Sequence, residues 1–379
     1  MRKTLQLLTA LALALPMTSF VPATTTSTPA QALAPQSQAP QSQEIGTEES
    51  LSVRVGGKSR STMIERPGSG YVKIHFTDVR ILPGDVLTVS NPDGTEKYTY
   101  TRDLKASLTA TIDRSGFWAM SITGDKAVVS VNNPLSRVRI DKITRGYTEA
   151  EMSSQPSVQS ICGTNDYKDA VCYQSSNPTE FGKTASVAKL LRNGSSLCTG
   201  WRVGPKNHML TNNHCFTSTN GIEVWFNYQC PTCGGTTSAT VTKVMADRVL
   251  KTNAGLDYTL FSVRNFETIT SFGYLELDAR VPAVGEEMYI IGHPAGKLKK
   301  LSLRDNNNGG GYCVVRAVRV NGSSSQSDIS YMCDTEGGSS GSPVLSRRTH
   351  KVIGLHHFGG CPNQGVRIDL VAAQINPLL

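Results

Sequence analysis

Short runs that alternate between hydrophobic and polar residues dominate the chain, and they predict β-strands rather than helices. In the first half, residues 71–76, 86–89 and 127–131 combine β-branched or aromatic side chains with polar neighbours. Proline, glycine and aspartate separate these runs, for example at residues 82–85 and 91–94, and such clusters are typical of turns. Short strands at near-regular spacing predict a small antiparallel β-sandwich in this region.

The second half of the chain contains further strand-like runs, at residues 221–228, 257–263, 288–291 and 352–355 among others. Many short strands of this kind favour a barrel or sandwich architecture. A parallel α/β sheet would need amphipathic helices between its strands, and the sequence pattern does not contain them. The predicted fold class is therefore all-β.

The first residues have the pattern of a secretory signal peptide. Met1-Arg2-Lys3 precedes an apolar run over residues 5–15, and a small-residue site ends at Ala23. We therefore assign residues 1–23 to a signal peptide and expect a secreted, extracellular protein. No later apolar run is long enough to cross a bilayer, so no membrane association is expected. Residues 24–50 contain repeated Pro-Gln-Ser and are expected to form a disordered, low-complexity segment.

The cysteines mark a boundary between two parts of the chain. All nine lie between Cys162 and Cys361. In an exported protein they predict disulfides formed in an oxidising compartment. The apolar pattern lapses between residues 140 and 156, which places the join there. We therefore expect a β-rich region with its linker over residues 51–156 and a separate domain over residues 157–379.

The net charge of +8 raises the question of nucleic-acid binding. The basic residues are scattered along the chain rather than clustered with aromatic residues. We therefore expect no nucleic-acid partner.

A loop of small residues around Ser340 is the first candidate for chemistry. Residues 335–344 read Thr-Glu-Gly-Gly-Ser-Ser-Gly-Ser-Pro-Val. Glycine at position 338 lets the backbone turn so that its N–H and that of Ser340 can point together, forming an oxyanion hole for acyl transfer. On its own such a loop is more often a flexible linker, so the interpretation depends on a base and an acid elsewhere in the chain.

His214 and Asp257 are the candidate base and acid. A serine hydroxyl becomes a good nucleophile when a base takes its proton and a third group orients that base. His214 follows a strand and precedes Cys215, and a Cys198–Cys215 bridge would hold it rigidly. Asp257 opens an alternating strand and can lie half-buried. Asp247 is a competing acid, although the adjacent Arg248 indicates a solvated pair.

Cys230 and Cys233 have the spacing of a zinc knuckle. No second Cys/His pair stands at ligand spacing, so we expect no metal and no other cofactor.

The order His214, Asp257, Ser340 resembles the chymotrypsin-fold serine endopeptidases. Thr-x-x-His-Cys surrounds the base and Gly-x-Ser-Gly-Ser-Pro the nucleophile. The motifs are most similar to those of secreted bacterial lysyl, arginyl and glutamyl endopeptidases. They include residues 225–229, the Asp-aromatic-Thr-Leu strand and the Gly-Leu-His-His-Phe-Gly-Gly segment. The resemblance covers residues 157–379 and implies two six-stranded β-barrels with the triad in the cleft between them.

The resemblance also implies further disulfides. Besides Cys198–Cys215 it implies the pairs Cys162–Cys361 and Cys172–Cys233. Cys313 and Cys333 are a plausible cross-strand pair, which leaves Cys230 unpaired.

The residues expected to bind the substrate side chain indicate two different specificities. Asp334 stands six residues before Ser340, where trypsin-like enzymes carry the acid that pairs with Arg or Lys. Thr335 and His356 match the residues with which glutamyl endopeptidases receive a carboxylate. Opposite charges attract, so we predict cleavage after Arg or Lys, with glutamyl specificity as the alternative and a structural role for Asp334 also open. His357 is expected to line the cleft or to face water.

The complete expectation is a chymotrypsin-like double β-barrel preceded by a small β-sandwich-like pro-domain. The protein would be a secreted serine endopeptidase that acts on polypeptides as a monomer. Its pro-region would be an intramolecular inhibitor or chaperone, removed by self-cleavage near Arg145 or Glu151, although a retained adhesion module is the other possibility. A non-catalytic binding protein on a protease fold is the rival function.

Overall fold

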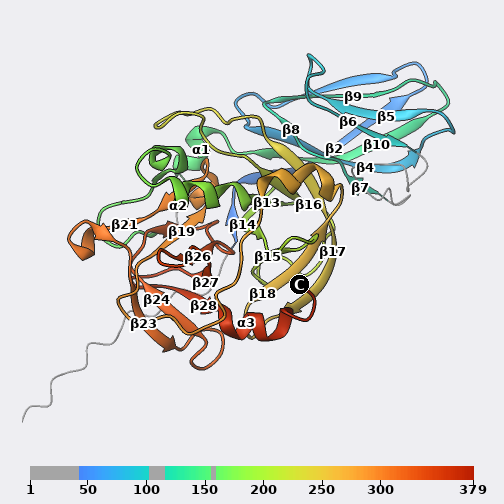
Figure 1. Ribbon diagram of the computed structural model, residues 1–379. Coiled ribbons are helices and arrows are strands. Elements are labelled where there is room, and N and C mark those ends of the chain that lie inside the picture. Colours follow the sequence, from blue (N-terminus) through green and yellow to red (C-terminus); the bar gives the residue numbers. More distant parts are fainter. Residues whose placement is uncertain (1–41, 102–115, 155–158) are drawn as a thin grey trace, which may run out of the picture. The chain divides into compact units, whose positions relative to one another are not determined.

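The computed structural model describes residues 42–101, 116–154 and 159–379 (Figure 1). The predicted signal peptide and most of the predicted disordered segment lie outside these residues. Within the described residues, no helix has the length and apolar character needed to span a membrane.

Residues 46–101 and 116–146 form a β-sandwich, as predicted. One sheet contains β2 (Gly46–Gly56), β10 (Arg137–Gly146), β4 (Tyr71–Arg80), β7 (Phe117–Trp118) and β8 (Ile122–Thr123). The other contains β3 (Ser61–Glu65), β9 (Lys126–Val131), β5 (Val86–Ser90) and β6 (Lys97–Thr101). Alternate residues of both sheets point inward, so Ile74 and Phe76 of β4 share one buried core with Leu87 and Val129.

Two boundaries of this region differ from the sequence prediction. Residues 43–50 were expected to be disordered, but they form β1 (Gln43–Glu44) and the start of β2. Ile45 is buried between these strands, so its apolar side chain anchors a stretch of otherwise polar composition. The expected join at residues 140–156 is also wrong in part, because β10 pairs with both β2 and β4 and is a central strand.

The first barrel is closed and has six strands. They are β13 (Val187–Arg192), β14 (Ser196–Arg202), β15 (Met209–Thr211), β16 (Ile222–Phe226), β17 (Thr242–Asn253) and β18 (Tyr258–Val263). Closure comes from β15, which pairs with both β14 and β18. β1 pairs with Ser196 and Leu197 of β14, on the same edge as β15, because β13 occupies the opposite edge. The barrel interior contains Leu190, Val224, Phe226 and Phe261.

The second sheet curls into a half-barrel. Its order is β12 (Lys168–Asp169), β20 (Lys300–Ser302), β19 (Met288–Gly292), β26 (Pro343–Ser346), β27 (Val352–Phe358), β28 (Asn363–Arg367), β24 (Asp328–Tyr331) and β23 (Val315–Val320). The described strands β12 and β23 do not pair with each other, so this sheet differs from the closed barrel that the resemblance implied. With that difference, the predicted double-barrel fold is confirmed.

The two barrels share a buried core, and short elements complete the domain. Leu210 and Leu260 of the first barrel pack in one cluster with Leu345 and Val366 of the second. The remaining helices and strands are α1 (Glu149–Ser154), β11 (Gln159–Ser160), α2 (Pro178–Lys183), β21 (Arg304–Asp305), β22 (Gly311–Tyr312), β25 (Thr335–Glu336) and α3 (Ile368–Ile375).

Four disulfides crosslink the two-barrel domain, and they are the pairs expected from the sequence. The structure contains Cys162–Cys361, Cys172–Cys233, Cys198–Cys215 and Cys313–Cys333. Cys230 is a free, buried cysteine. Because Cys233 is bonded to Cys172, Cys230 and Cys233 cannot act together as a zinc knuckle.

Candidate active site

Ser340 lies in a loop between β25 and β26 that neighbouring strands hold firmly. The N–H of Thr199 on β14 donates to the Ser340 carbonyl at 2.8 Å, and the Thr199 hydroxyl donates to the Gly338 carbonyl at 3.0 Å. The N–H of Gly341 donates to the carbonyl of His356 at 2.9 Å. Both barrels therefore fix the position of the serine.

Gly338 is required by its conformation and by its surroundings. Its φ is +93°, which side-chain-bearing residues rarely adopt. A Cβ atom there would also lie 2.4 Å from a methyl group of Leu197. The N–H groups of Gly338 and Ser340 make no hydrogen bond to any residue that the structure describes, so both donors are available to a ligand.

His214 and Asp257 form a doubly hydrogen-bonded pair, as predicted. The backbone N–H of His214 donates to Asp257 Oδ1 at 2.9 Å, and its Nδ1 lies 2.8 Å from Asp257 Oδ2. Burial would raise the pKa of Asp257, but hydrogen bonds from His214 and His357 lower it below its ordinary value. Asp257 is therefore ionised at neutral pH and fixes both the ring and the loop that carries it.

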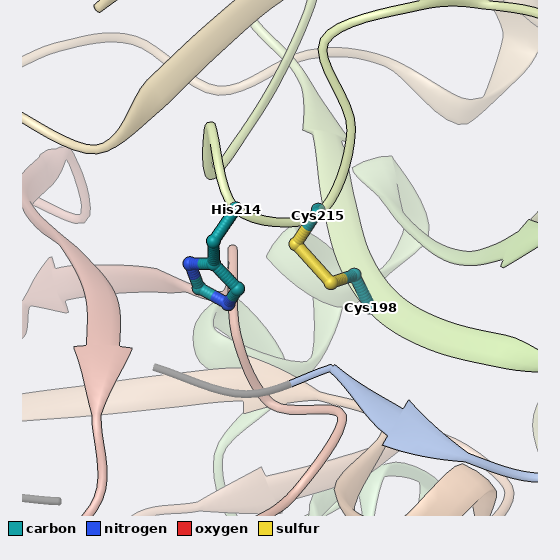
Figure 2. A group of neighbouring side chains, drawn as sticks. All are labelled: Cys198, His214 and Cys215. Atoms are coloured by element: carbon teal, nitrogen blue, oxygen red, sulfur yellow. A yellow bond between two sulfur atoms is a disulfide. The ribbon is translucent and has the colours of Figure 1, made fainter. Parts of the chain in front are cut away.

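The Cys198–Cys215 disulfide fixes the other side of His214 (Figure 2). His214, Cys198 and Cys215 lie together, but both sulfur atoms belong to the disulfide and are not thiolate ligands for a metal. Cys215 Sγ also lies 4.0 Å from the Ser340 carbonyl oxygen, so the histidine loop and the serine loop are in contact.

The hydrogen bond between Ser340 and His214 that would complete the expected triad is not formed in this structure. His214 Nε2 is buried and has no hydrogen-bond partner among the described residues. A hydrogen bond from Ser340 Oγ is therefore not formed here, although the serine and histidine loops touch. Such bonds are often long in enzymes without substrate and shorten on binding.

His357 contacts Asp257 and belongs to a buried chain of charged groups. Its Nδ1 lies 3.1 Å from Asp257 Oδ2 and its Nε2 lies 2.5 Å from Asp328 Oδ2. Burial would lower the pKa of His357, but the two carboxylates raise it to about 9. His357 is therefore a buried cation, so the expectation that it might face water is wrong. No sequence motif pointed to Asp328, because its role depends on contact between β24 and β27 through β28.

The Asp334 side chain accepts hydrogen bonds from the backbone of the segment around Cys162 and Asp166. Its two carboxylate oxygens accept the N–H groups of Cys162 at 2.8 Å and Asp166 at 2.6 Å. Burial raises its pKa to about 6, against the opposing effect of these hydrogen bonds. The carboxylate therefore has a structural role next to the Cys162–Cys361 disulfide.

Thr335 begins β25 and His356 lies within β27, and each side chain has its own buried hydrogen-bond partner. Thr335 Oγ1 bonds Asn363 Oδ1 at 3.1 Å, and His356 Nδ1 lies 2.8 Å from the Tyr331 hydroxyl. Burial and the nearby histidines lower the pKa of His356 to about 3, and burial raises that of Tyr331. The hydrogen bond between the Tyr331 hydroxyl and His356 Nδ1 therefore joins two uncharged groups.

Asp247, the competing acid, is not part of this arrangement. It lies near Arg264 and Arg248 and accepts a hydrogen bond from Ser262. Only Asp257 of the two candidates contacts His214.

Comparison with known proteins agrees with this geometry. Residues 198–355 match the family model described as a trypsin-like peptidase domain. The match agrees with the resemblance expected from the sequence.

Two curated proteins are similar over part of their length. Secreted RxLR effector protein 73 of Plasmopara viticola is 33% identical over 227 residues, which is 55% of this chain and 54% of that protein. Uncharacterized protein y4fB of Sinorhizobium fredii is 32% identical over 173 residues, or 42% of this chain and 25% of that protein. The chain therefore spans about half the length of the first relative and a quarter of the second.

Solved protease structures are also similar at low identity. A Glu endopeptidase in complex with MPD has a TM-score of 0.42 and 18% identity, and the match covers 57% of this chain and 98% of that one. The serine endoprotease from Yersinia pestis has a TM-score of 0.41 and 14% identity, over 53% and 65% of the two chains. The active form of the Rv3671c protease from M. tuberculosis has a TM-score of 0.40 and 16% identity, over 54% and 85%.

Proposed function

We propose that the protein is a secreted serine endopeptidase that cleaves polypeptides through an acyl-enzyme. The observation that carries this proposal is the His214–Asp257 pair in contact with the Ser340 loop, where two N–H groups have no partner among the described residues. The match to the trypsin-like peptidase domain supports it independently. Export is supported by the four disulfides and by the relative named as a secreted effector.

In the proposed mechanism, the Ser340 hydroxyl attacks the carbonyl carbon of the scissile bond while His214 Nε2 takes its proton. The N–H groups of Gly338 and Ser340 donate to the oxyanion of the tetrahedral intermediate. His214 then protonates the leaving nitrogen, and water releases the acyl group through the same base. Asp257 keeps Nδ1 protonated, so that Nε2 is the basic nitrogen.

The Ser340→Ala variant tests this mechanism. Removing the nucleophile should lower kcat on the order of 10⁵-fold or more, whereas the melting temperature should stay within a few degrees because the loop is held by backbone hydrogen bonds. A fluorophosphonate probe should label the native protein and not the variant. Undiminished hydrolysis by the variant would contradict the proposal, and failure to label the native protein would favour the non-catalytic alternative.

The residues expected to contact the substrate side chain favour a carboxylate or carboxamide on it. Asp334 was expected to attract Arg or Lys, but its oxygens already accept two backbone N–H groups. His356 is uncharged at neutral pH because burial lowers its pKa to about 3, so one of its ring nitrogens carries a donor proton. We therefore place glutamyl specificity first and the predicted Arg or Lys specificity second.

Mapping cleavage sites in a denatured protein mixture distinguishes the two specificities. We expect cuts after Glu, and we expect His356→Leu to raise KM for Glu substrates at least about tenfold, because a lost hydrogen bond to a charged group costs about 1.5–3 kcal/mol. Asp334→Asn is the matched comparison and should lower stability more than it changes KM. Cuts after Arg or Lys that disappear in Asp334→Asn would instead support the cationic pocket.

A further inference from the structure

Four arginine side chains line one cavity on the β-sandwich. Arg54 is on β2, Arg80 is on β4, and Arg137 and Arg139 are on β10. These three strands are neighbours in one sheet, with β10 between the other two (Figure 1). The cavity has a volume of about 500 Å³, which lies within the range of sites that bind small molecules. We call these four residues the arginine cluster.

The strand register places the arginine cluster in two directly opposed pairs. Arg139 of β10 is paired with Arg54 of β2, and Arg137 of β10 is paired with Arg80 of β4. Directly opposed residues point to the same face of a sheet, with their Cβ atoms about 4.5–5.5 Å apart. Val138, between the two arginines of β10, packs in the buried core, so both pairs lie on the outer face.

The charges of the arginine cluster are not neutralised by the protein. None of its four guanidinium groups makes a salt bridge with any residue that the structure describes. Asp78 is the one acidic residue that lines the cavity, and it is exposed and forms no ion pair with them. One Nη atom of Arg139 donates to Ser52 Oγ at 3.2 Å, but its Nε is buried and has no hydrogen-bond partner. Four positive charges therefore stand against one negative charge.

Such an arrangement is unfavourable for the fold alone. Like charges directly opposite each other destabilise a sheet, and a buried donor without a partner loses its hydrogen bonds to water. Other cations of the sandwich are paired, such as Arg66 with Glu49 and Lys142 with Glu48. The arginine cluster is an exception to this pattern, and an anionic ligand would supply the missing negative charge.

We propose that the arginine cluster binds a sulfated polysaccharide, with one sulfate group on each arginine pair. A guanidinium group is planar and donates two parallel hydrogen bonds to an oxyanion. A sulfate ester presents three terminal oxygens to the two guanidinium groups of a pair. A carboxylate presents two oxygens, and a phosphodiester presents two that are not bridging. The sulfate ester therefore fits a pair of arginines best.

The shape and lining of the cavity favour a polysaccharide over a nucleic acid. None of the lining residues is aromatic, whereas proteins hold single-stranded nucleic acids largely by stacking bases on aromatic side chains. A duplex is too wide for this cavity, since its major groove alone is about 12 Å across. The two arginine pairs lie about 7 Å apart along β10, which suits anionic groups that repeat along a single extended chain.

This binding site goes beyond the proposed endopeptidase activity. All four arginines belong to the sandwich, so the site would hold the protein on a sulfated surface without taking part in peptide cleavage. Whether Ser340 cleaves peptides therefore has no bearing on the test of this proposal.

Binding of the full chain to dextran sulfate, measured by isothermal titration calorimetry, tests the proposal. Unmodified dextran is the same polymer without sulfate groups. We expect binding to dextran sulfate that weakens as salt screens the charges, and no binding to dextran. Arg54→Gln/Arg80→Gln removes one arginine from each pair and should raise Kd at least about tenfold, because hydrogen bonds between charged groups are lost.

Lys58→Gln/Lys97→Gln is the matched control. It removes the same amount of charge from exposed positions of the sandwich outside the cavity, and should change Kd less than about twofold because exposed charges are well screened. Arg54→Lys/Arg80→Lys keeps the charge but loses the bidentate geometry, so it should recover only part of the affinity. Because opposed like charges destabilise a sheet, Arg54→Gln/Arg80→Gln should keep or raise the melting temperature.

Each of the other outcomes would overturn the proposal. No binding to dextran sulfate, or an equal loss of affinity in both glutamine double variants, would show that the arginine cluster is not a site. A lower melting temperature with an unchanged Kd in Arg54→Gln/Arg80→Gln would assign the arginines to the fold. Equal or tighter binding to duplex DNA would make nucleic acid the partner, and equal binding to carboxymethyl dextran would remove the preference for sulfate. Full affinity in the lysine variant would contradict bidentate binding.

Discussion

At the scale of single residues, the proposed catalytic pair His214–Asp257 depends on further buried charges that contact Asp257. Asp257 accepts hydrogen bonds from His214 and from His357, and His357 in turn contacts Asp328. A buried cation between two carboxylates compensates charges that burial would otherwise destabilise. Asp257 can therefore stay ionised and buried, which is what orienting His214 requires.

This arrangement predicts a specific dependence of stability on pH. The pKa of His357 is raised from about 6.5 to about 9 in the folded protein, so its charged form stabilises the fold fully below pH 6.5. That contribution should decline as the pH rises through 9, by roughly 3 kcal/mol for a shift of this size. The free energy of unfolding in urea, measured between pH 6 and 9.5, tests this decline.

Asp328→Asn is the informative variant for this effect. It removes one of the two carboxylates that face His357, so the decline above pH 6.5 should become smaller and kcat should fall while KM changes little. Asp247→Asn, in the other candidate acid, is the control and should change neither quantity. A decline of the same size in Asp328→Asn would show that His357 is not its source.

Sequence reasoning proposed His214, Asp257 and Ser340 as a triad but did not reach these supporting residues, for a physical reason. His214, Asp257 and Ser340 are surrounded by local motifs that the chemistry requires. Asp328 and Tyr331 act through partners brought near by strand pairing, and an aspartate or tyrosine on a strand carries no local signal of its partner. Asp334 stands at the distance before Ser340 that is typical of a cation-binding acid. Its carboxylate instead accepts backbone N–H groups of residues 162 and 166, and these distant partners could not be read from the local sequence.

At the scale of elements, the turn after β15 and its disulfide determine the position of His214, the proposed base. Cys198 and Cys215 join β14 to the turn after β15 and close a loop with a sequence separation of 17. A loop of this length is stabilised by roughly 3 kcal/mol in the chain-entropy model. The same crosslink holds the His214 turn against the serine loop, so we expect it to affect both stability and activity.

Replacing both cysteines with alanine should separate these two effects. The Cys198→Ala/Cys215→Ala variant should lose about 2–4 kcal/mol of unfolding free energy and should also have a lower kcat, because the histidine turn loses its anchor. The Cys172→Ala/Cys233→Ala variant removes a crosslink that joins neither catalytic loop, so its kcat should be retained. Equal losses of kcat in both variants would argue against positioning by the first disulfide.

The strands themselves were largely predictable, and the exceptions have a common cause. Alternating patterns identified the sandwich and the barrel strands, since one buried face is enough to produce a period of two. Residues 43–45 lack such a pattern because their order comes from pairing with β14 and from burial of Ile45 alone. Composition favoured disorder there, and a contact between distant segments overrode it.

At the scale of the whole molecule, a buried ion pair joins the sandwich to the first barrel. Lys73 of β4 and Glu223 of β16 form a salt bridge in which both side chains are fully buried. Glu223 also accepts hydrogen bonds from the N–H and hydroxyl of Ser121, at 2.9 and 2.7 Å, and from the indole of Trp225 at 2.7 Å. A removable pro-domain would leave this polar cluster without its partners, so these contacts favour a sandwich that is retained.

Lys73→Met tests how strongly the sandwich is docked. Removing one partner of a buried ion pair leaves an uncompensated charge and typically costs about 3–5 kcal/mol. We expect unfolding in two steps, with the sandwich released first and cleaved by added protease. Adding Glu223→Gln removes the orphaned charge while keeping an acceptor for Ser121 and Trp225, so the double variant should recover at least half of the lost stability. If Lys73→Met unfolds in one step at the wild-type urea concentration, the ion pair does not hold the sandwich, and retention would have to rest on the apolar contacts of Tyr71 with Trp225.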